Sequence, residues 1–175
     1  MDVKKAIESR RSIREYQDKE VPDNLIIELI DAARRAPSGN NAQPSRYSIV
    51  KDSRIKNKLR ESEIFEQDCF YEAPVIIVCC ADPASYKKRV EKWDDQNSTR
   101  AIRDLSIASS YLVLRATELG LGTCYVGWIK KEEIKTVLGI PKEYIVPYVI
   151  TVGYPAEDPK PTPRKSIDEI LIQKN

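Results

Sequence analysis

The 175-residue sequence predicts an α+β fold in which helices pack on a central sheet. Residues 74–81 (PVIIVCCA) form a continuous apolar, β-branched run, which is typical of a central strand covered on both faces. Residues 99–119 carry apolar side chains at helical spacing on more than one side, which is typical of a helix buried in the domain or at a subunit contact. The length suits one hydrophobic core and no internal repeat is visible, so residues 1–175 are expected to form a single domain.

The first half of the chain alternates helices with strands. Apolar spacing predicts helices over residues 3–10 and 23–36, and Pro22 suits the first turn of the second helix. That helix must end before residues 37–41 (PSGNN), which are turn-forming throughout. Residues 46–50 are expected to form a strand, and Asp52 or Ser53 can cap a short helix that reaches about residue 62.

The second half adds two further strands and an extended tail. Gly120 and Gly122 end the long helix. Residues 123–129 read as a strand or extended loop, 130–138 as a helix and 147–153 as a buried strand. Four prolines between residues 155 and 163 exclude a helix there and predict an extended tail, which an amphipathic segment over residues 167–172 closes.

Composition excludes several classes of function. The net charge of +2 is too small to indicate a nucleic-acid or membrane partner, and no apolar stretch approaches the roughly 20 residues of a membrane span. The chain has no histidine, which excludes Ser-His-Asp and Cys-His nucleophile activation. Its four cysteines lack metal-site spacing and are expected to be buried free thiols. We therefore expect a soluble, cytoplasmic protein without a metal, whose chemistry rests on carboxylates, lysine, tyrosine or a bound cofactor.

Residues 10–14 (RRSIR) follow the first expected helix. In an extended chain Arg10, Ser12 and Arg14 would point to one side, where two guanidinium groups and a hydroxyl suit a phosphate. The alternative is a basic helix end that interacts with the helix dipole, and these five residues alone favour that alternative.

Two further segments carry ligand-binding chemistry. Residues 37–44 (PSGNNAQP) are dense in groups that both donate and accept hydrogen bonds, which suits a polar heterocycle or an ordinary polar loop equally. Residues 120–127 (GLGTCYVG) offer close backbone approach to a flat ligand, although alone they fit a helix end that runs into a strand. Arg164, in the proline-rich tail, reads alone as a surface arginine.

In this order along the chain, these segments resemble the nitroreductase family. The resemblance runs from RRSIR through APSGNNAQP, APVIIVCCAD and ATELGLGTCYVGW to VGYPAEDPKPTPRKS, which is essentially the whole chain. It implies an α/β/α sandwich with a central, mostly antiparallel sheet, and an intertwined homodimer with FMN at the subunit interface. It also implies an NADH- or NADPH-dependent oxidoreductase that reduces nitroaromatics, quinones or similar small acceptors by a ping-pong mechanism.

The resemblance assigns cofactor-binding roles to particular positions. Arg10 and Ser12, with Arg11 close by, and Arg164 would hold the phosphate and ribityl end, and Arg14 would lie near the N1/O2 edge of the ring, where it would stabilise negative charge. The other subunit would contribute a loop that contacts the ring and the ribityl chain: Pro37, Ser38, Gly39 and Asn41, with Gln43 supporting it. Backbone near Tyr125, Val126 and Gly127 would face the reactive N5 side. No side chain is expected to be catalytic, because the flavin carries the chemistry.

Ser45 and Gly39 differ from the residues common at these positions in the family. The resemblance therefore does not indicate which substrate this chain uses. Phe70, Tyr71, Trp93 and Tyr125 are candidates for lining the pocket, although packing or an interface is the default role for Phe70, Tyr71 and Trp93. Two alternatives stay open: an FMN-binding protein without turnover, acting as a sensor or carrier, and a specialised chemistry such as dehalogenation or flavin breakdown.

Overall fold

A computed structural model describes residues 2–86 and 96–173. The helices are α1 (Val3–Ser9), α2 (Asp23–Arg34), α3 (Ser53–Glu61), α4 (Asn97–Glu118), α5 (Lys131–Leu138) and α6 (Ile167–Ile170). The strands are β1 (Ser45–Val50), β2 (Val75–Ala81), β3 (Gly122–Val126) and β4 (Ile145–Gly153), and short 3-10 turns lie at Gly39–Asn41 (η1), Asp68–Phe70 (η2) and Pro83–Ser85 (η3).

The four strands form one sheet in the order β1-β2-β4-β3, and every neighbouring pair is antiparallel. All seven residues of β2 are buried. Alternate side chains of β2 point to opposite faces, so Val75, Ile77 and Cys79 belong to one core while Ile76 and Val78 belong to the other. The apolar run at 74–81 is therefore a central strand with both faces covered, as the sequence predicted.

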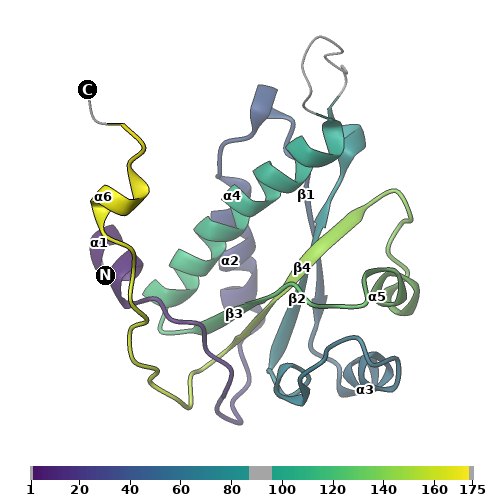
Figure 1. The fold of residues 1–175 in the computed structure, drawn as a ribbon. Coiled ribbons are helices and arrows are strands. Elements are labelled where there is room, and N and C mark those ends of the chain that lie inside the picture. Colours follow the sequence, from purple (N-terminus) through teal and green to yellow (C-terminus); the bar gives the residue numbers. More distant parts are fainter. Residues whose placement is uncertain (1, 87–95, 174–175) are drawn as a thin grey trace.

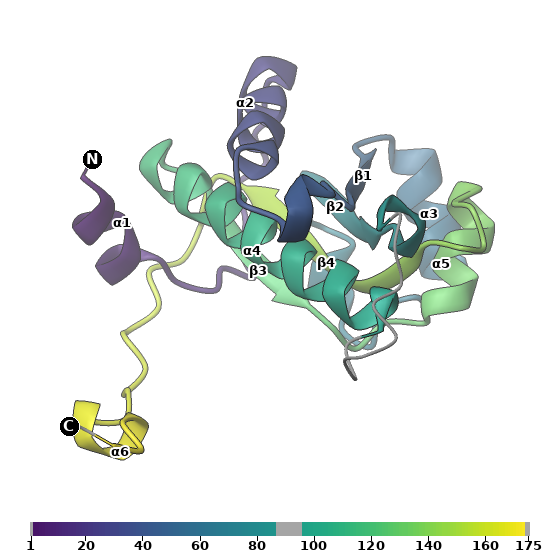
Figure 2. The same ribbon diagram turned by 90° about the horizontal axis from the view of Figure 1, so that it is seen from above.

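The two cores lie in separate layers of the molecule. Helices α2 and α4 cover one face of the sheet, and α3 and α5 cover the other (Figure 1). Seen from above, the same helices flank the sheet on opposite sides (Figure 2). The predicted α/β/α sandwich with an antiparallel sheet is confirmed.

Strand β4 begins two residues before its predicted start. It spans Ile145–Gly153, and its register with β2 shifts between Cys79 and Ala81. Pro147 lies within the strand and has no N–H to donate, so it fits an irregular part of the ladder. The sequence predicted this buried strand over residues 147–153.

The N-terminal segment lies along the outer edge of β3. Ser12 forms a parallel bridge with Thr123, and the N–H of Ile13 donates to the Thr123 carbonyl at 2.9 Å. Ile13 is buried, and a Cβ at Gly122 would lie 2.7 Å from its Cγ1. Glycine at position 122 therefore allows residues 10–14 to lie against the sheet.

The C-terminal tail leaves the body of the molecule. Residues 154–157 still pair with residues 15–17, through hydrogen bonds such as Gln17 N–H to the Tyr154 carbonyl at 2.9 Å. From Lys160 to Gln173 every residue is exposed, and α6 projects away from the sheet (Figures 1 and 2). The tail is extended as predicted. The closing amphipathic segment forms a helix of only four residues, and its isoleucines are exposed to solvent.

None of the described helices combines the length and the apolar composition needed to cross a lipid bilayer.

The contact between Ile13 and Gly122 leads to a stability prediction. Gly122→Ala should lower the free energy of unfolding by about 1–3 kcal/mol, because the added methyl group must displace Ile13 and the segment beside it. Urea unfolding followed by circular dichroism measures the loss. Gly127→Ala is the matched control, since a Cβ there meets nothing within 4 Å and should change stability little. Equal stability of the two variants would contradict this packing.

Candidate functional site

Residues 10–14 place alternate side chains on opposite sides, as expected of an extended segment. Ile13 points into the core, whereas Arg14 is exposed and Ser12 is partly exposed. Within the described residues, the guanidinium groups of Arg10 and Arg14 donate no hydrogen bond to a protein group. Two cationic donors and a hydroxyl thus remain available on one side of the segment, beside β3.

Arg11 takes a different role. Its guanidinium donates to the carbonyls of Glu8 at 2.8 Å and Arg10 at 2.9 Å, at the C-terminal end of α1. A cation there satisfies carbonyls that lack helical partners. The helix-end interpretation, which the sequence left open for the whole segment, therefore describes Arg11.

Arg10 and Arg14 lie close to β3. Burial raises the pKa of the Cys124 thiol, and the Arg14 and Arg10 guanidinium groups oppose that rise. Burial likewise raises the pKa of Tyr125, and Arg10 opposes it. Cys124 therefore stays a neutral thiol near neutral pH, and it is the buried free thiol that the sequence predicted.

A pocket of about 260 Å³ lies at the end of β3. It brings together four residues predicted for the site, which are Arg14, Tyr125, Val126 and Gly127. Its other walls come from Phe70, a predicted lining residue, and from Glu66, Gln67, Cys124 and Trp128. Tyr71 lies outside this pocket, and its hydroxyl donates to the Phe65 carbonyl at 3.2 Å and accepts from the Phe65 N–H at 2.7 Å. Trp93 lies outside the described residues.

The loop over residues 37–43 forms a second group. Asn40, Asn41 and Gln43 all adopt positive φ angles of 49–54°, which asparagine tolerates better than most residues. The Ser38 hydroxyl accepts from the Gln43 N–H at 3.0 Å, and the Gln43 amide donates to the Asn41 carbonyl at 3.3 Å. Gln43 therefore forms hydrogen bonds to two other residues of the loop. Pro37 and other residues of the loop line a pocket of about 420 Å³, and Asp104 lines it as well.

Asp104 of α4 anchors this loop. Its side chain is 4% exposed, and its carboxylate accepts from the Gly39 N–H at 2.7 Å and from the Tyr86 hydroxyl. Burial, together with the bond to Asp104, raises the pKa of Tyr86 to about 12, so Tyr86 remains a donor near neutral pH. The Arg100 guanidinium lies 4.0 Å from the centre of the Tyr86 ring. Asp104 was not among the residues predicted for the site. Its partner Gly39 is 65 positions away, and no local sequence pattern connects the two residues.

Arg164 is placed in the exposed tail. Its guanidinium donates to the hydroxyl and carbonyl of Thr162 and to the carbonyl of Pro163. These hydrogen bonds stay within the tail, which projects away from the sheet (Figures 1 and 2).

The predicted residues thus form two separate half-sites on one chain. The loop is attached to α4 at Asp104, while the chain leaves α4 at Glu118 to enter β3 and the pocket beside it. From position 104 to position 118 the helix rises about 20 Å, at about 1.5 Å per residue, and Ser12 pairs with Thr123 just beyond that end. Strand β3 then returns beside α4, so that Tyr125 lies near Ser110. The loop and the segment at residues 10–14 are therefore held by different parts of the chain.

The donor set fits an anionic ligand with a polar ring. Arg10, Ser12 and Arg14 supply positive charge and donors, and Val126 and Gly127 supply backbone at the pocket. Across residues 2–86 and 96–173, no group of three or more cysteine, aspartate or glutamate residues is placed to hold a metal ion.

Comparison with known proteins gives a consistent result. The chain matches the family model described as the nitroreductase family over residues 7–67 and 61–154. It is 36% identical to a protein of Methanothermobacter thermautotrophicus, named as a candidate NADH dehydrogenase/NAD(P)H nitroreductase, over 99% of this chain and 88% of that protein.

Solved structures agree in fold. A nitroreductase family protein from Clostridium difficile superposes with a TM-score of 0.86 at 27% identity, covering 100% of this chain and 99% of that one. A protein from Exiguobacterium sibiricum, described as a candidate nitroreductase in complex with FMN, superposes with a TM-score of 0.88 over 99% of this chain and 98% of that one. At 21% identity, the second likeness shows the fold alone.

The anchor at Asp104 leads to a prediction about the loop. Asp104→Ala should expose the Gly39 N–H to exchange with solvent, raising its hydrogen-exchange rate at least about 10-fold, which corresponds to the loss of about 1.4 kcal/mol of protection. Amide exchange measured by NMR reports on this single group. Tyr86→Phe is the matched control, because it removes a second donor to Asp104 but leaves the Gly39 bond in place. Unchanged exchange at Gly39 in the alanine variant would show that Asp104 does not hold the loop.

Proposed function

Because the chain belongs to the nitroreductase family, we propose that it is an FMN-dependent oxidoreductase that passes electrons from NADH or NADPH to a small organic acceptor. The acceptor class is a nitroaromatic, a quinone or a similar electrophile. The observation that carries the proposal is the group of Arg10, Ser12 and Arg14 beside β3, whose guanidinium groups have no protein partner within the described residues. Support also comes from the FMN named in the Exiguobacterium sibiricum complex.

Each residue of the half-site has a role in this proposal. Arg10 and Ser12 hold the phosphate and ribityl end, since arginine offers paired donors and serine adds one more. Arg14 lies in the wall of the pocket and presents positive charge to the N1/O2 edge of the ring. Val126 and Gly127 place backbone beside the ring, and Gly127 leaves open space where a side chain would stand.

When bound, FMN supplies the hydride transfer, which explains how a chain without histidine can carry out redox chemistry. Donor and acceptor would approach the bound flavin in turn at the same place, so ping-pong kinetics are expected.

We further propose that two chains form a homodimer with shared sites. The tail exposes Ile167 (70%), Ile170 (62%) and Leu171 (45%) to solvent, and α1 exposes Val3 (71%) and Ile7 (58%). Burying each such side chain contributes about 1.5–3 kcal/mol, so exposed clusters of this kind indicate an interface. A second copy that takes up the tail would also bring its loop, and Arg164, to the Arg10 half-site.

A cytoplasmic location accompanies this proposal. All four cysteines are free thiols, and three of them are buried, which fits a reducing compartment.

The proposal is tested by the visible spectrum of the purified protein under anaerobic conditions. A flavin spectrum is expected, and NADH or NADPH should bleach it because the cofactor accepts a hydride from the nicotinamide. A spectrum that persists with both donors would indicate an FMN-binding protein without turnover. A protein that remains colourless after FMN is added would refute the assignment.

The phosphate contact gives a second prediction. Arg10→Ala should weaken FMN binding by about 1.5–3 kcal/mol, on the order of 10- to 100-fold in Kd, because a charged donor is lost. Arg11→Ala is the control and should bind FMN as the natural chain does, since Arg11 bonds to carbonyls of Glu8 and Arg10. Flavin fluorescence titration measures both constants.

The same variant tests whether the site is shared. Asn41→Asp should damage the loop half-site by placing a carboxylate where an amide stood, at a φ of 52° that aspartate also tolerates. When Arg10→Ala and Asn41→Asp chains are unfolded, mixed and refolded, half of the dimers are mixed and each holds one intact site. About a quarter of all sites should then bind FMN tightly. No recovery on mixing would place both half-sites on the same chain.

A further inference from the structure

A second pocket lies beside the one at the end of β3. It encloses about 580 Å³ and is lined on one side by Ile64, Phe65 and Tyr71, and on the other by Ile129 and Lys130. The two pockets share two walls, which are Glu66 and Trp128. These two side chains therefore lie between the ring-binding pocket and the outer pocket.

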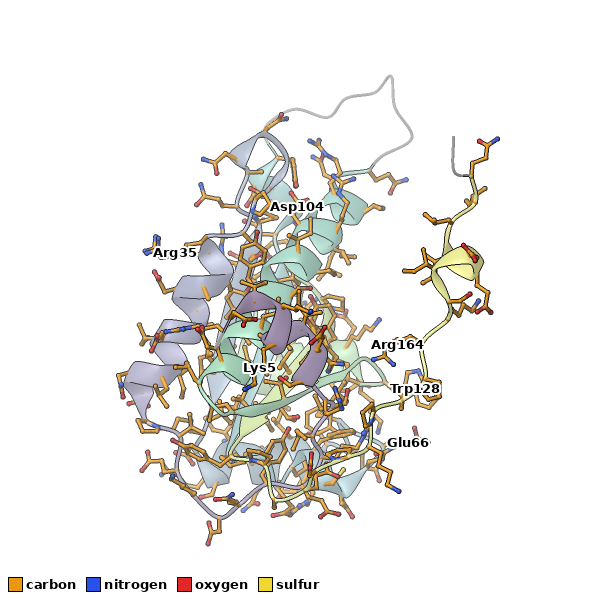
Figure 3. All side chains as sticks on the ribbon, turned by 90° about the vertical axis from the view of Figure 1, so that its left-hand side faces the viewer. Lys5, Arg35, Glu66, Asp104, Trp128 and Arg164 are labelled. Atoms are coloured by element: carbon orange, nitrogen blue, oxygen red, sulfur yellow. The ribbon has the colours of Figure 1, made fainter. Side chains whose placement is uncertain are left out.

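Local chain pairing fixes Glu66 and Trp128 opposite each other. Phe65 and Ile129 form an antiparallel bridge, and the Lys130 N–H donates to the Ile64 carbonyl at 3.1 Å. In that register residue 66 faces residue 128, and directly opposed side chains lie on the same face about 5 Å apart at Cβ. Phe65, on the other face, is 4% exposed and packs into the core. Figure 3 shows Glu66 and Trp128 on one side of the molecule.

Trp128 has the most exposed aromatic side chain of the described residues. It is 81% exposed, and no described aromatic ring or cation stacks on it. A tryptophan is normally buried over most of its surface, so a free indole face beside a pocket indicates a binding surface for a flat ligand. Its neighbour Gly127 lines the inner pocket, and a Cβ there would meet nothing within 4 Å.

Glu66 gives this surface a negative charge. In the outer pocket the other charges are paired: Lys130 with Glu63 at 2.9 Å, and Arg60 with Glu72 and, at 4.0 Å, with Asp68. The Arg14 guanidinium, which has no protein partner among residues 2–86 and 96–173, lines the inner pocket and not the outer one. Within the described residues Glu66 has no hydrogen bond or ion pair. An anionic ligand on the indole face of Trp128 would therefore meet an uncompensated carboxylate a few ångströms away.

We propose that Trp128 and Glu66 select the electron acceptor, so that a planar aromatic acceptor without negative charge stacks on Trp128 while Glu66 disfavours anionic ones. The inference deepens the proposed function and rests on it. The outer pocket receives the part of the acceptor that extends beyond the reacting ring. Both residues are specificity determinants, since neither is required to move a proton or an electron.

The test compares naphthoquinone with its sulfonate, which have the same rings and differ in charge. Equilibrium dialysis against the oxidised holoprotein measures the Kd of each. Trp128→Ala should raise both constants about 5- to 10-fold, and Trp128→Phe, the matched control, should raise them less than about 2-fold because a ring remains. Glu66→Gln should lower the Kd of the sulfonate about 2- to 5-fold and leave that of the neutral quinone unchanged.

Turnover gives an independent measurement. The ratio of kcat/KM for the two quinones should follow the binding constants, while oxidation by molecular oxygen, which has no ring to stack, should be the same in all variants. Unchanged binding in Trp128→Ala, or an equal effect of Glu66→Gln on both quinones, would overturn the inference. So would a change of oligomeric state in Trp128→Ala, which would make the indole an interface residue. The visible spectra separate these outcomes from failure of the proposed function. If the proposed function fails, the natural chain itself shows no flavin spectrum. If only this inference fails, the natural chain and the variants still bind FMN.

Discussion

The packing of α4 on the sheet is the constraint on which the rest of the structure depends. Its buried stripe of Ala101, Leu105, Ala108, Leu112 and Ala116 repeats every three or four residues and lies against β2 and β4. Small alanines let the helix approach the sheet closely, and the leucines fill the space between them. Asp104 of α4 holds the loop at residues 37–43, and the other end of the helix leads into β3, where Ser12 pairs with Thr123. The loop and the N-terminal segment are thus attached at separate places along this layer.

That separation determines how a site can form. Asp104 holds the loop near one end of α4, and Gly122 lets residues 10–14 lie against β3 beyond the other end. Each half-site is organised by contacts within its own chain, so neither needs a ligand to take its shape. In the homodimer that we propose, a ligand that needs both lies between two chains, and the projecting tail provides the exposed apolar surface that joins them.

Sequence patterns predicted the parts of the fold that depend on neighbouring residues. The run at 74–81 and the stripe at 99–119 identified β2 and α4 because burial on two faces or on a helical stripe is visible within one window. The start of β4 was misplaced because Pro147 sits where the ladder is irregular, which depends on the partner strand. At the site, alternation along RRSIR correctly put Ile13 on the opposite side from Ser12 and Arg14. It could not show that Arg11 caps α1, or that Asp104, Glu66 and Trp128 matter. Those roles arise from contacts between distant segments.

The absence of histidine and the use of glycine are connected. A chain without histidine lacks the commonest general base, and in the function that we propose a bound group carries the chemistry while the protein holds flat molecules close to its backbone. Gly122 permits the N-terminal segment to approach β3, and Gly127 leaves space at the end of the same strand. Proteins that share this architecture can then differ in the side chains around the space at Gly127. In this chain those side chains are an exposed indole and an unpaired carboxylate, fixed opposite each other by the pairing of Phe65 with Ile129. In the function that we propose, these two residues change the choice of acceptor while the groups that would hold FMN stay the same.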